Sequence, residues 1–382
     1  MPHDRFEWSA QPPSNSLADR VEAGRSERTG WKPSTRAALS MALVGLGLVG
    51  GGVHSAVAAP SQALVKPQTS PSLAVIDQFE SPDSHGNLVD ALLHHQSLKL
   101  PHRINEDVTG LALVETQAEF EEFVTDLMQY LPARALDQVT AQLDKINRAG
   151  ASPIKTVNLS LALSKAGRFQ LLTQFLERDP QASERMRRFL GLSEKVGSRE
   201  FSQSLLNKLE SLYDTSPDLL KSRQRYQQTL EQLNRRNIVV VVSAGNEGEL
   251  QDQLRQQNLN SSPTFFDNLF SSHNHTINVG AVDGQHRLWA ESNPGADLLA
   301  QGVAIPITVA QTTRYYDGTS FAAPRVAELI DEMRKLNPTL SRDQILDILR
   351  KTSDPVQGPR AQVGSGEINP ARALQATGRL QP

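Results

Sequence analysis

A serine at the start of a helix is the first residue of this sequence that could do chemistry. Tyr316–Pro324 contains Gly318, Thr319 and Ser320 ahead of an apolar run with helical spacing. Glycine allows a sharp approach of the chain, and hydroxyl residues are typical of a first helical turn. The pattern places Ser320 at the positive end of a helix dipole, among small neighbours that leave room for another group. For such a string taken alone a simple helix cap is the more common explanation, so other residues must decide.

Three further polar residues lie upstream of this serine, next to short apolar segments. Leu73–Ile76 ends at Asp77, and the β-branched run Ile238–Val242 leads through small residues to Asn246. Between them, His85 opens an amphipathic helical segment. An apolar run that ends in a carboxylate suits a buried parallel strand, whose C-terminal edge is where α/β sheets bind ligands.

The order Asp77, His85, Asn246, Ser320 resembles the motif order of the subtilisin-like serine peptidases, the subtilases. The resemblance implies a serine endopeptidase in which His85 accepts the proton of Ser320, while Asp77 holds the histidine tautomer and stabilises the imidazolium. Asn246 and the backbone N–H of Ser320 would bind the oxyanion. We therefore expect His85 within hydrogen-bond reach of both Asp77 and Ser320.

The interval between Asp77 and His85 departs from the family, in which it is several times longer. Asn87 also stands where the family motif usually has a different residue. A strand end and a helix start joined by a short loop can still bring two side chains together. The alternative function is a catalytically degenerate subtilase fold that binds peptides or a partner through a helical insert. An esterase of the α/β-hydrolase type is excluded because the G-x-S-x-G elbow is absent.

The resemblance also implies a substrate-binding segment after the predicted strand Lys155–Leu161. In the family, this segment lies along the substrate backbone and lines the pocket for the residue before the scissile bond. A pure core strand is fully compatible with the same residues. The substrate would be an extended protein or peptide segment beside a strand edge. The residues assigned to substrate binding are Ser160, Leu161, Ala162, Ala244 and Gly245.

The predicted fold class is α/β: a three-layer subtilisin-like fold with a mostly parallel central sheet flanked by helices, plus an all-helical insertion at about 163–236. Apolar residues recur at helical spacing within this insertion and predict two to four helices. Its charged amphipathic helices suit a solvated lid or packing module, or an arm that binds a protein partner. Gln117–Arg148 is also predicted to be helical, with a break at Pro132.

The N-terminal part of the chain resembles an export signal. Residues 1–36 are polar and predicted to be disordered. Residues 37–59 combine an apolar run, a basic flank before it and a small-residue site at Ala56 and Ala58, which indicates a cleaved signal peptide or an uncleaved membrane anchor. A linker at 60–72 precedes the catalytic domain at 73–382. This order predicts a secreted or periplasmic protein, or one anchored in the membrane through 37–59 with its catalytic domain outside the cytoplasm.

Composition excludes several classes of protein. The net charge of -3 and the scattered lysines and arginines give no footprint for nucleic acid. Without cysteine there is neither a disulfide nor a thiolate metal site. No acidic loop has ion-ligand spacing, so neither a metal nor another cofactor is predicted. His94, His95 and His102 are predicted to be solvated helix or loop residues.

Overall fold

The fold is organised around one parallel β-sheet. The structure, a computed structural model, describes residues 71–102, 114–149 and 153–379. The sheet has six strands in the spatial order β2-β1-β3-β4-β5-β6, and every neighbouring pair is parallel. The bounds of these strands are β1 Leu73–Asp77, β2 Ser97–Pro101, β3 Thr156–Leu159, β4 Val239–Ser243, β5 Thr276–Val282 and β6 Leu298–Gln301.

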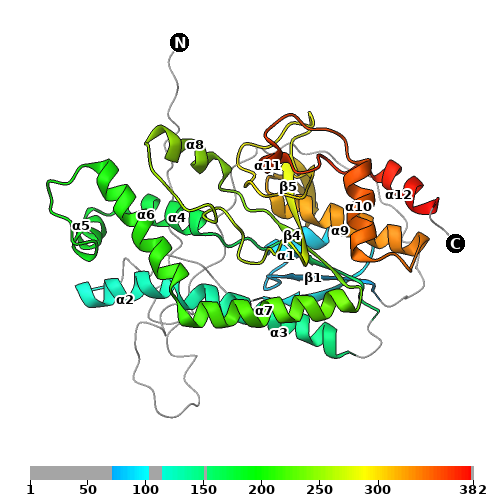
Figure 1. Cartoon of the computed structure of the whole chain (residues 1–382), viewed down its shortest axis with the longest axis horizontal. Helices are drawn as coiled ribbons and strands as arrows, with labels where there is room; N and C mark the ends of the chain where they lie inside the picture. Colours follow the sequence, from blue (N-terminus) through cyan, green and yellow to red (C-terminus); the bar gives the residue numbers. More distant parts are fainter. Residues whose placement is uncertain (1–70, 103–113, 150–152, 380–382) are drawn as a thin grey trace.

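Helices cover both faces of this sheet (Figure 1). On one side lie α9 and its C-terminal companions, and on the other lie the two long helices α3 and α7. The helix bounds are α1 His85–Asp90, α2 Gln117–Met128, α3 Tyr130–Arg148, α4 Lys165–Arg178, α5 Pro180–Phe189, α6 Ser198–Asp214, α7 Pro217–Arg235, α8 Gly248–Gln256, α9 Thr319–Leu336, α10 Arg342–Thr352, α11 Arg360–Val363 and α12 Pro370–Gly378.

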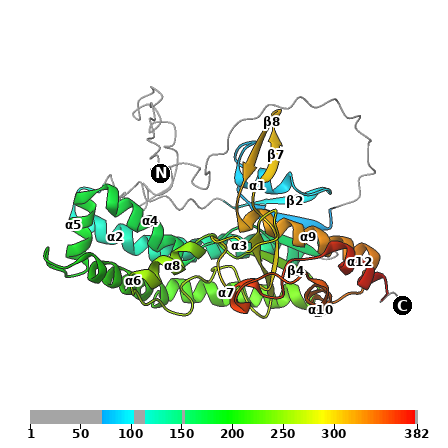
Figure 2. The same cartoon turned by 90° about the horizontal axis from the view of Figure 1, so that it is seen from above.

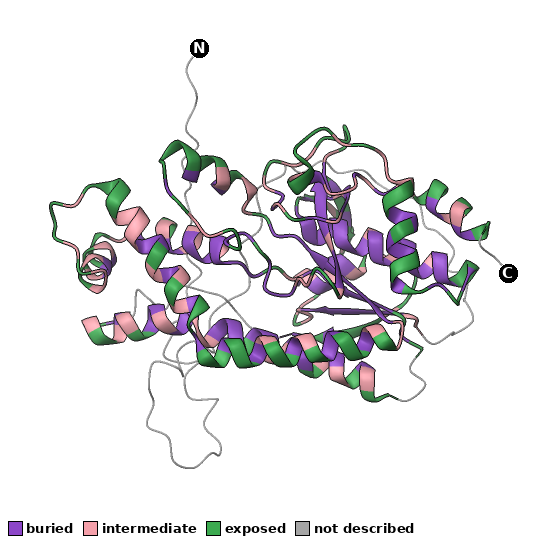
Figure 3. Ribbon diagram, viewed as in Figure 1, coloured by how far each residue is buried: buried purple, intermediate pink, exposed green. Residues whose placement is uncertain are grey.

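Strand β4 shows why the sheet needs a helical layer on each face. Val239 and Val241 belong to the hydrophobic core under α9, whereas Val240 and Val242 belong to the core under α3 and α7. Successive side chains of a strand point to opposite faces, so an unbroken β-branched run must be covered twice. All five residues of β4 are buried (Figure 3). The predicted three-layer α/β class is confirmed.

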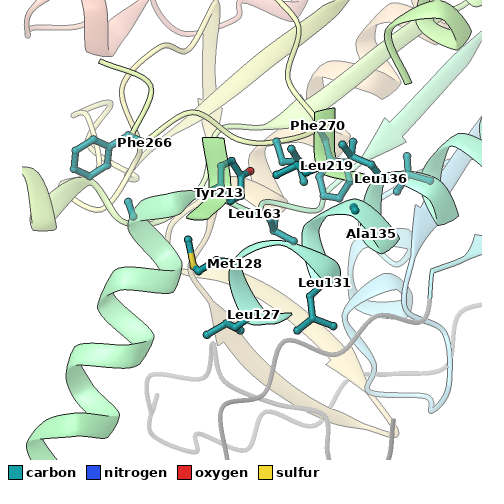
Figure 4. Packing of buried hydrophobic residues seen from close by; sticks show 14 of the residues in the cluster. Leu127, Met128, Leu131, Ala135, Leu136, Leu163, Tyr213, Leu219, Phe266 and Phe270 are labelled. Carbon is teal, nitrogen blue, oxygen red and sulfur yellow. The ribbon is translucent and has the colours of Figure 1, made fainter. Parts of the chain in front are cut away.

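The all-helical insertion is also confirmed, because α4 to α7 occupy residues 165 to 235. Helices α4, α5 and α6 extend with α2 away from the sheet, while α7 returns along it beside α3 (Figure 1). We call α2 and α4 to α7 the helical lobe. A large apolar cluster joins this lobe to the sheet, with Leu127, Leu136 and Phe270 among its members (Figure 4). The insertion therefore shares a core with the sheet.

Lys165, at the start of α4, fixes the lobe to a neighbouring loop. Its side chain is 3% exposed, and its ammonium group donates to Asp214 of α6 at 3.0 Å. The same group donates to Ser262 and Thr264, in the loop between α8 and β5, at 3.1 and 3.0 Å. A buried charge needs such partners, so α4, α6 and this loop are held at one point.

The predicted helix break at Pro132 is wrong by a few residues. Helix α2 ends at Met128, and α3 begins at Tyr130, so that Pro132 lies inside the first turn of α3. Proline is tolerated there because the first N–H groups of a helix have no partner within the helix.

A two-stranded antiparallel hairpin leads directly into α9. Strands β7 (Ile305–Val309) and β8 (Thr312–Tyr316) are joined by Ala310 and Gln311, which have φ values of 47° and 67°. Two consecutive positive φ angles give a turn whose twist matches that of the strands. Figure 2 shows the hairpin standing out beside α1 and β2.

The predicted divisions of the N-terminal part lie outside the described residues. This applies to 1–36, to 37–59 and to all but the last two residues of 60–72. Among the helices of the described ranges, none has the length and apolar character needed to cross a bilayer.

Candidate active site

Asp77 and His85 are in direct hydrogen-bond contact. Asp77 is the last residue of β1 and is fully buried, and His85 is the first residue of α1. The Nδ1 atom of His85 lies 2.9 Å from both carboxylate oxygens of Asp77. The backbone N–H of Gln78 donates to the same carboxylate at 2.7 Å. The short interval between the two residues therefore does not prevent their pairing.

Gly86 allows this contact because it lies against the turn that follows β1. A Cβ atom at Gly86 would come within 2.5 Å of the carbonyl oxygen of Gln78 and 2.7 Å of the Asp77 Cβ atom. The backbone N–H of Gly86 donates to that carbonyl oxygen at 2.9 Å. Any side chain at this position would push the start of α1, and with it His85, away from Asp77.

The pKa of His85 reflects two opposing causes. Burial lowers it, whereas the charge of Asp77 and the hydrogen bond to Asp77 raise it, and the net effect is a pKa above the ordinary value of 6.5. The imidazole side chain is 33% exposed and so stays in reach of solvent. Asp77 thus stabilises the protonated form of His85, as a base that accepts a proton requires.

Ser320 lies in the first turn of α9 and is 7% exposed. Pro324 follows four residues later in the same helix and has no N–H to give to the Ser320 carbonyl oxygen. The side-chain hydroxyl of Ser160 donates to that oxygen instead, at 2.8 Å. The carbonyl oxygen that Pro324 leaves without a helical donor is thus bonded to the segment after β3. This relation was not predicted from the sequence.

Thr319 sets the orientation of the Asn246 side chain. Asn246 Oδ1 accepts hydrogen bonds from the backbone N–H and the hydroxyl of Thr319, at 3.0 and 2.9 Å. The Thr319 hydroxyl also accepts from the backbone N–H of Gly245 at 3.1 Å. Because the amide oxygen is held by Thr319, the amide N–H₂ group faces away from it. Asn246 is an exposed residue.

The side chains of Ser320 and Asn246 converge beside Gly318. A Cβ atom added at Gly318 would lie 3.0 Å from Ser320 Oγ and 3.5 Å from Asn246 Nδ2, so both atoms lie next to this glycine. The His85 ring lies 5.8 Å from the ring of Phe321, which follows the serine. Among the described residues, Ser320 Oγ has no hydrogen-bond partner, so the expected His85–Ser320 bond is absent while the Asp77–His85 bond is present.

The residues assigned to substrate binding lie on two segments next to this site. Ser160 and Ala244 are buried, Leu161 is half-buried and Ala162 is exposed. Gly245 has a φ of 108°, and a Cβ atom there would overlap the side-chain amide of Asn293. Glycine is therefore required at 245 by both conformation and space.

His102 corrects one sequence prediction. It was predicted to be solvated but is 4% exposed, with its ring against Phe270 at 6.3 Å between centroids. Burial lowers its pKa to about 4, against a smaller opposing effect of Asp77. Its backbone N–H donates to the Asp77 carbonyl oxygen at 2.7 Å. His102 is thus a neutral core residue that supports the end of β1, whereas the His94 side chain is 81% exposed, as predicted.

Comparison with known proteins places the chain in a family. The family model described as "Subtilase family" matches residues 142–366, more than half of the chain. The chain belongs to the subtilase family. The matched residues of this subtilase include Asn246 and Ser320, whereas Asp77 and His85 lie before them.

Individual relatives match shorter stretches of this subtilase. Subtilisin DY of Bacillus licheniformis is 34% identical over 141 residues, which are 36% of this chain and 47% of the relative. Subtilisin E of Bacillus subtilis is 33% identical over 141 residues, or 36% of this chain and 34% of the relative. The cell wall-associated protease of Bacillus subtilis is 29% identical over 135 residues, 35% of this chain and 13% of the relative. The matches thus span less than half the length of these relatives.

Among solved structures, the prenylagaramide maturation protease PagA has 15% sequence identity and a TM-score of 0.41. The superposition covers 80% of this chain and 92% of that chain.

No group of three or more histidine, aspartate or glutamate side chains in the described part of the chain is arranged to hold a metal ion. Two cavities, of about 190 and 470 Å³, are lined by residues other than Ser320, His85 and Asn246.

Replacing Gly86 with alanine should destabilise the subtilase by about 1–3 kcal/mol, because the added methyl group overlaps backbone and side-chain atoms after β1. The free energy of unfolding in urea measures this effect. Gly378→Ala is the matched control, since no atom lies within 4 Å of a Cβ atom there, and it should change stability by less than about 0.5 kcal/mol. Equal effects of the two substitutions would contradict the close approach at Gly86.

Proposed function

We propose that this chain is a serine endopeptidase in which Ser320 is the nucleophile, His85 the general base and Asp77 the residue that orients the base. The observation that carries the proposal is the proximity of Ser320 Oγ and Asn246 Nδ2 beside Gly318, with the amide oxygen held by Thr319. This arrangement brings a hydroxyl and a hydrogen-bond donor close together, as acyl transfer requires.

In this proposal Ser320 Oγ attacks the carbonyl carbon of the scissile peptide bond, and its proton passes to His85 Nε2. The negative charge that forms on the carbonyl oxygen is bound by Asn246 Nδ2 and the backbone N–H of Ser320. His85 then gives the proton to the leaving amine as the C–N bond breaks, and water releases the acyl group by the same steps. The His85–Ser320 bond forms when substrate binds, since such bonds are often long without it.

The proposed substrate is a protein or peptide in an extended conformation along Ser160, Leu161 and Ala162, with Ala244 and Gly245 opposite. The sequence pattern at 37–59 supports export, so the proposed location is secreted or periplasmic, with a membrane-anchored form as the alternative. A partner held by the helical insertion is a separate proposal, supported only by its charged amphipathic pattern.

A fluorophosphonate probe tests the nucleophile directly. The protein should become covalently labelled, and Ser320→Ala should abolish labelling because the reacting oxygen is lost. Ser211→Ala, at an exposed position of α6, is the control and should leave labelling unchanged. Intact-mass spectrometry counts the attached probe. Lack of labelling in a folded sample would favour the alternative, a catalytically degenerate protein that binds peptides.

Asn246→Ala should lower kcat by about 10²- to 10³-fold, which is the loss in subtilisin when its oxyanion-hole asparagine is removed, with a smaller change in KM. The physical reason is that the donor stabilises charge that is present in the transition state only. Asn274→Ala, at an exposed asparagine, serves as the control and should retain full activity. A kcat within twofold of the wild-type value for Asn246→Ala would refute the oxyanion role.

The activity should be lost in acid as His85 becomes protonated. Because Asp77 raises the pKa of His85, the midpoint of kcat/KM against pH should lie above 6.5. Asp77→Asn removes both raising causes and leaves burial, so the midpoint should move to lower pH and kcat should fall by about 10⁴-fold. Glu367→Gln is the control, since Glu367 raises the pKa of His286 on the surface. An acid limb unmoved by Asp77→Asn would contradict the assignment of the base.

A further inference from the structure

Two segments, one after β3 and one after β4, are hydrogen-bonded to the first turn of α9, which contains Ser320. One begins at Ser160, whose hydroxyl donates to the Ser320 carbonyl oxygen. The other reaches Gly245, whose N–H donates to the Thr319 hydroxyl. In the proposed function, a scissile carbonyl held by Ser320 Oγ and Asn246 Nδ2 would direct the side chain of the preceding substrate residue toward the space between these two segments.

Asn268 joins the two segments through its side-chain amide. Asn268 Nδ2 donates to the carbonyl oxygen of Leu161 at 2.9 Å and to that of Ser243 at 2.7 Å. Asn268 Oδ1 accepts from the backbone N–H groups of Leu163 and Phe270, both at 3.1 Å. An amide has two N–H donors and two acceptor lone pairs, so every one of them is used here.

The surroundings of Asn268 leave it little freedom to move. It is 3% exposed, and its partners Leu163 and Phe270 belong to the large apolar cluster, where both are labelled in Figure 4. Behind the second segment, the fully buried Asn293 donates its backbone N–H to the Gly245 carbonyl oxygen at 3.0 Å. Asn293 also donates from Nδ2 to Glu247 at 2.5 Å. The segment that contains Gly245 is therefore held in place by Asn293.

We propose that Asn268 is a specificity-determining residue, which closes the space between the two segments so that only glycine, alanine or serine fits before the scissile bond. The inference rests on the proposed peptidase function and names its substrate class. A large side chain would have to displace the amide, which would leave the buried carbonyl groups of Leu161 and Ser243 without donors. Unpaired buried groups of this kind are costly, in addition to the steric conflict.

The test compares two peptides that differ only in the residue before the scissile bond, alanine or phenylalanine. For the wild-type chain, kcat/KM should favour alanine by at least about tenfold. In Asn268→Gly the space opens, and the phenylalanine-to-alanine ratio of kcat/KM should rise by at least about tenfold. Asn268→Ser, which also shortens the side chain, provides a second variant and should change the ratio in the same direction.

Asn237→Gly is the matched control. Asn237 also bonds backbone groups at both ends of its amide, donating to the Leu340 carbonyl oxygen at 2.6 Å and accepting from the Arg342 N–H at 3.1 Å. It precedes β4, whereas Asn268 contacts the residue at the end of that strand. Asn237→Gly should lower the free energy of unfolding and leave the phenylalanine-to-alanine ratio unchanged. Asn268→Gly would give the same result if Asn268 had a purely structural role.

The outcomes separate this inference from the proposed function. Preference of the wild-type chain for phenylalanine, or an unchanged ratio in both Asn268 variants, would overturn the role of Asn268 while the peptidase function stands. If neither variant folds, the ratio of kcat/KM for the two peptides in the wild-type chain alone tests the role of Asn268. Absence of cleavage of either peptide, together with absence of fluorophosphonate labelling, would overturn the peptidase function and this inference with it.

Discussion

A carboxylate buried at the end of a strand is the constraint on which the site depends. Asp77 is fully enclosed, and a charge without partners in such a place costs several kcal/mol. The N–H of Gln78 and the imidazole of His85 supply the partners of its carboxylate, and the N–H of His102 holds its carbonyl oxygen. The end of β1, the start of α1 and the end of β2 are thereby tied to one residue.

The first turn of α9 holds the other half of the site in the same manner. Pro324 withholds an N–H from the Ser320 carbonyl oxygen, and Ser160 supplies the missing donor. Thr319 binds the amide oxygen of Asn246 through two donors. The side chains of Ser160, which follows β3, and Asn246, which follows β4, are therefore positioned by hydrogen bonds to one helical turn. Since parallel strands present their C-terminal ends to one edge, the sheet brings these segments together.

The helical insertion is connected to this edge through the loop between α8 and β5. Lys165 joins Asp214 of the insertion to Thr264 of the loop, and four residues further on Asn268 bridges the segments beside Ser320. Phe265 and Phe270 of the same loop lie in the core shared with the insertion. The insertion is therefore connected through this loop to the segments beside Ser320, in addition to covering one face of the sheet.

The sequence by itself determined the strands and helices, because periodicity is a local property, and the order of its polar motifs carried the resemblance that predicted the three-layer fold class. The β-branched run of β4 demanded a strand covered on both faces, and the helical spacing at 163–236 demanded helices. The Asp77–His85 contact was predicted from the resemblance to the subtilases, and the short loop between the strand end and the helix start permits it. The position of the break near Pro132 was predicted less well, because proline is accepted in a first turn as readily as before one.

Only the tertiary structure decided which distant groups meet. The hydroxyl of Ser160 reaches the carbonyl oxygen of a residue 160 positions further along, and Asn268 reaches back across 107 positions to Leu161. His102 lies in the core although its immediate sequence has no pattern that predicts burial. A hydrogen bond across such separations depends on packed layers that bring the chain back to one point, and no local spacing of residue types records it.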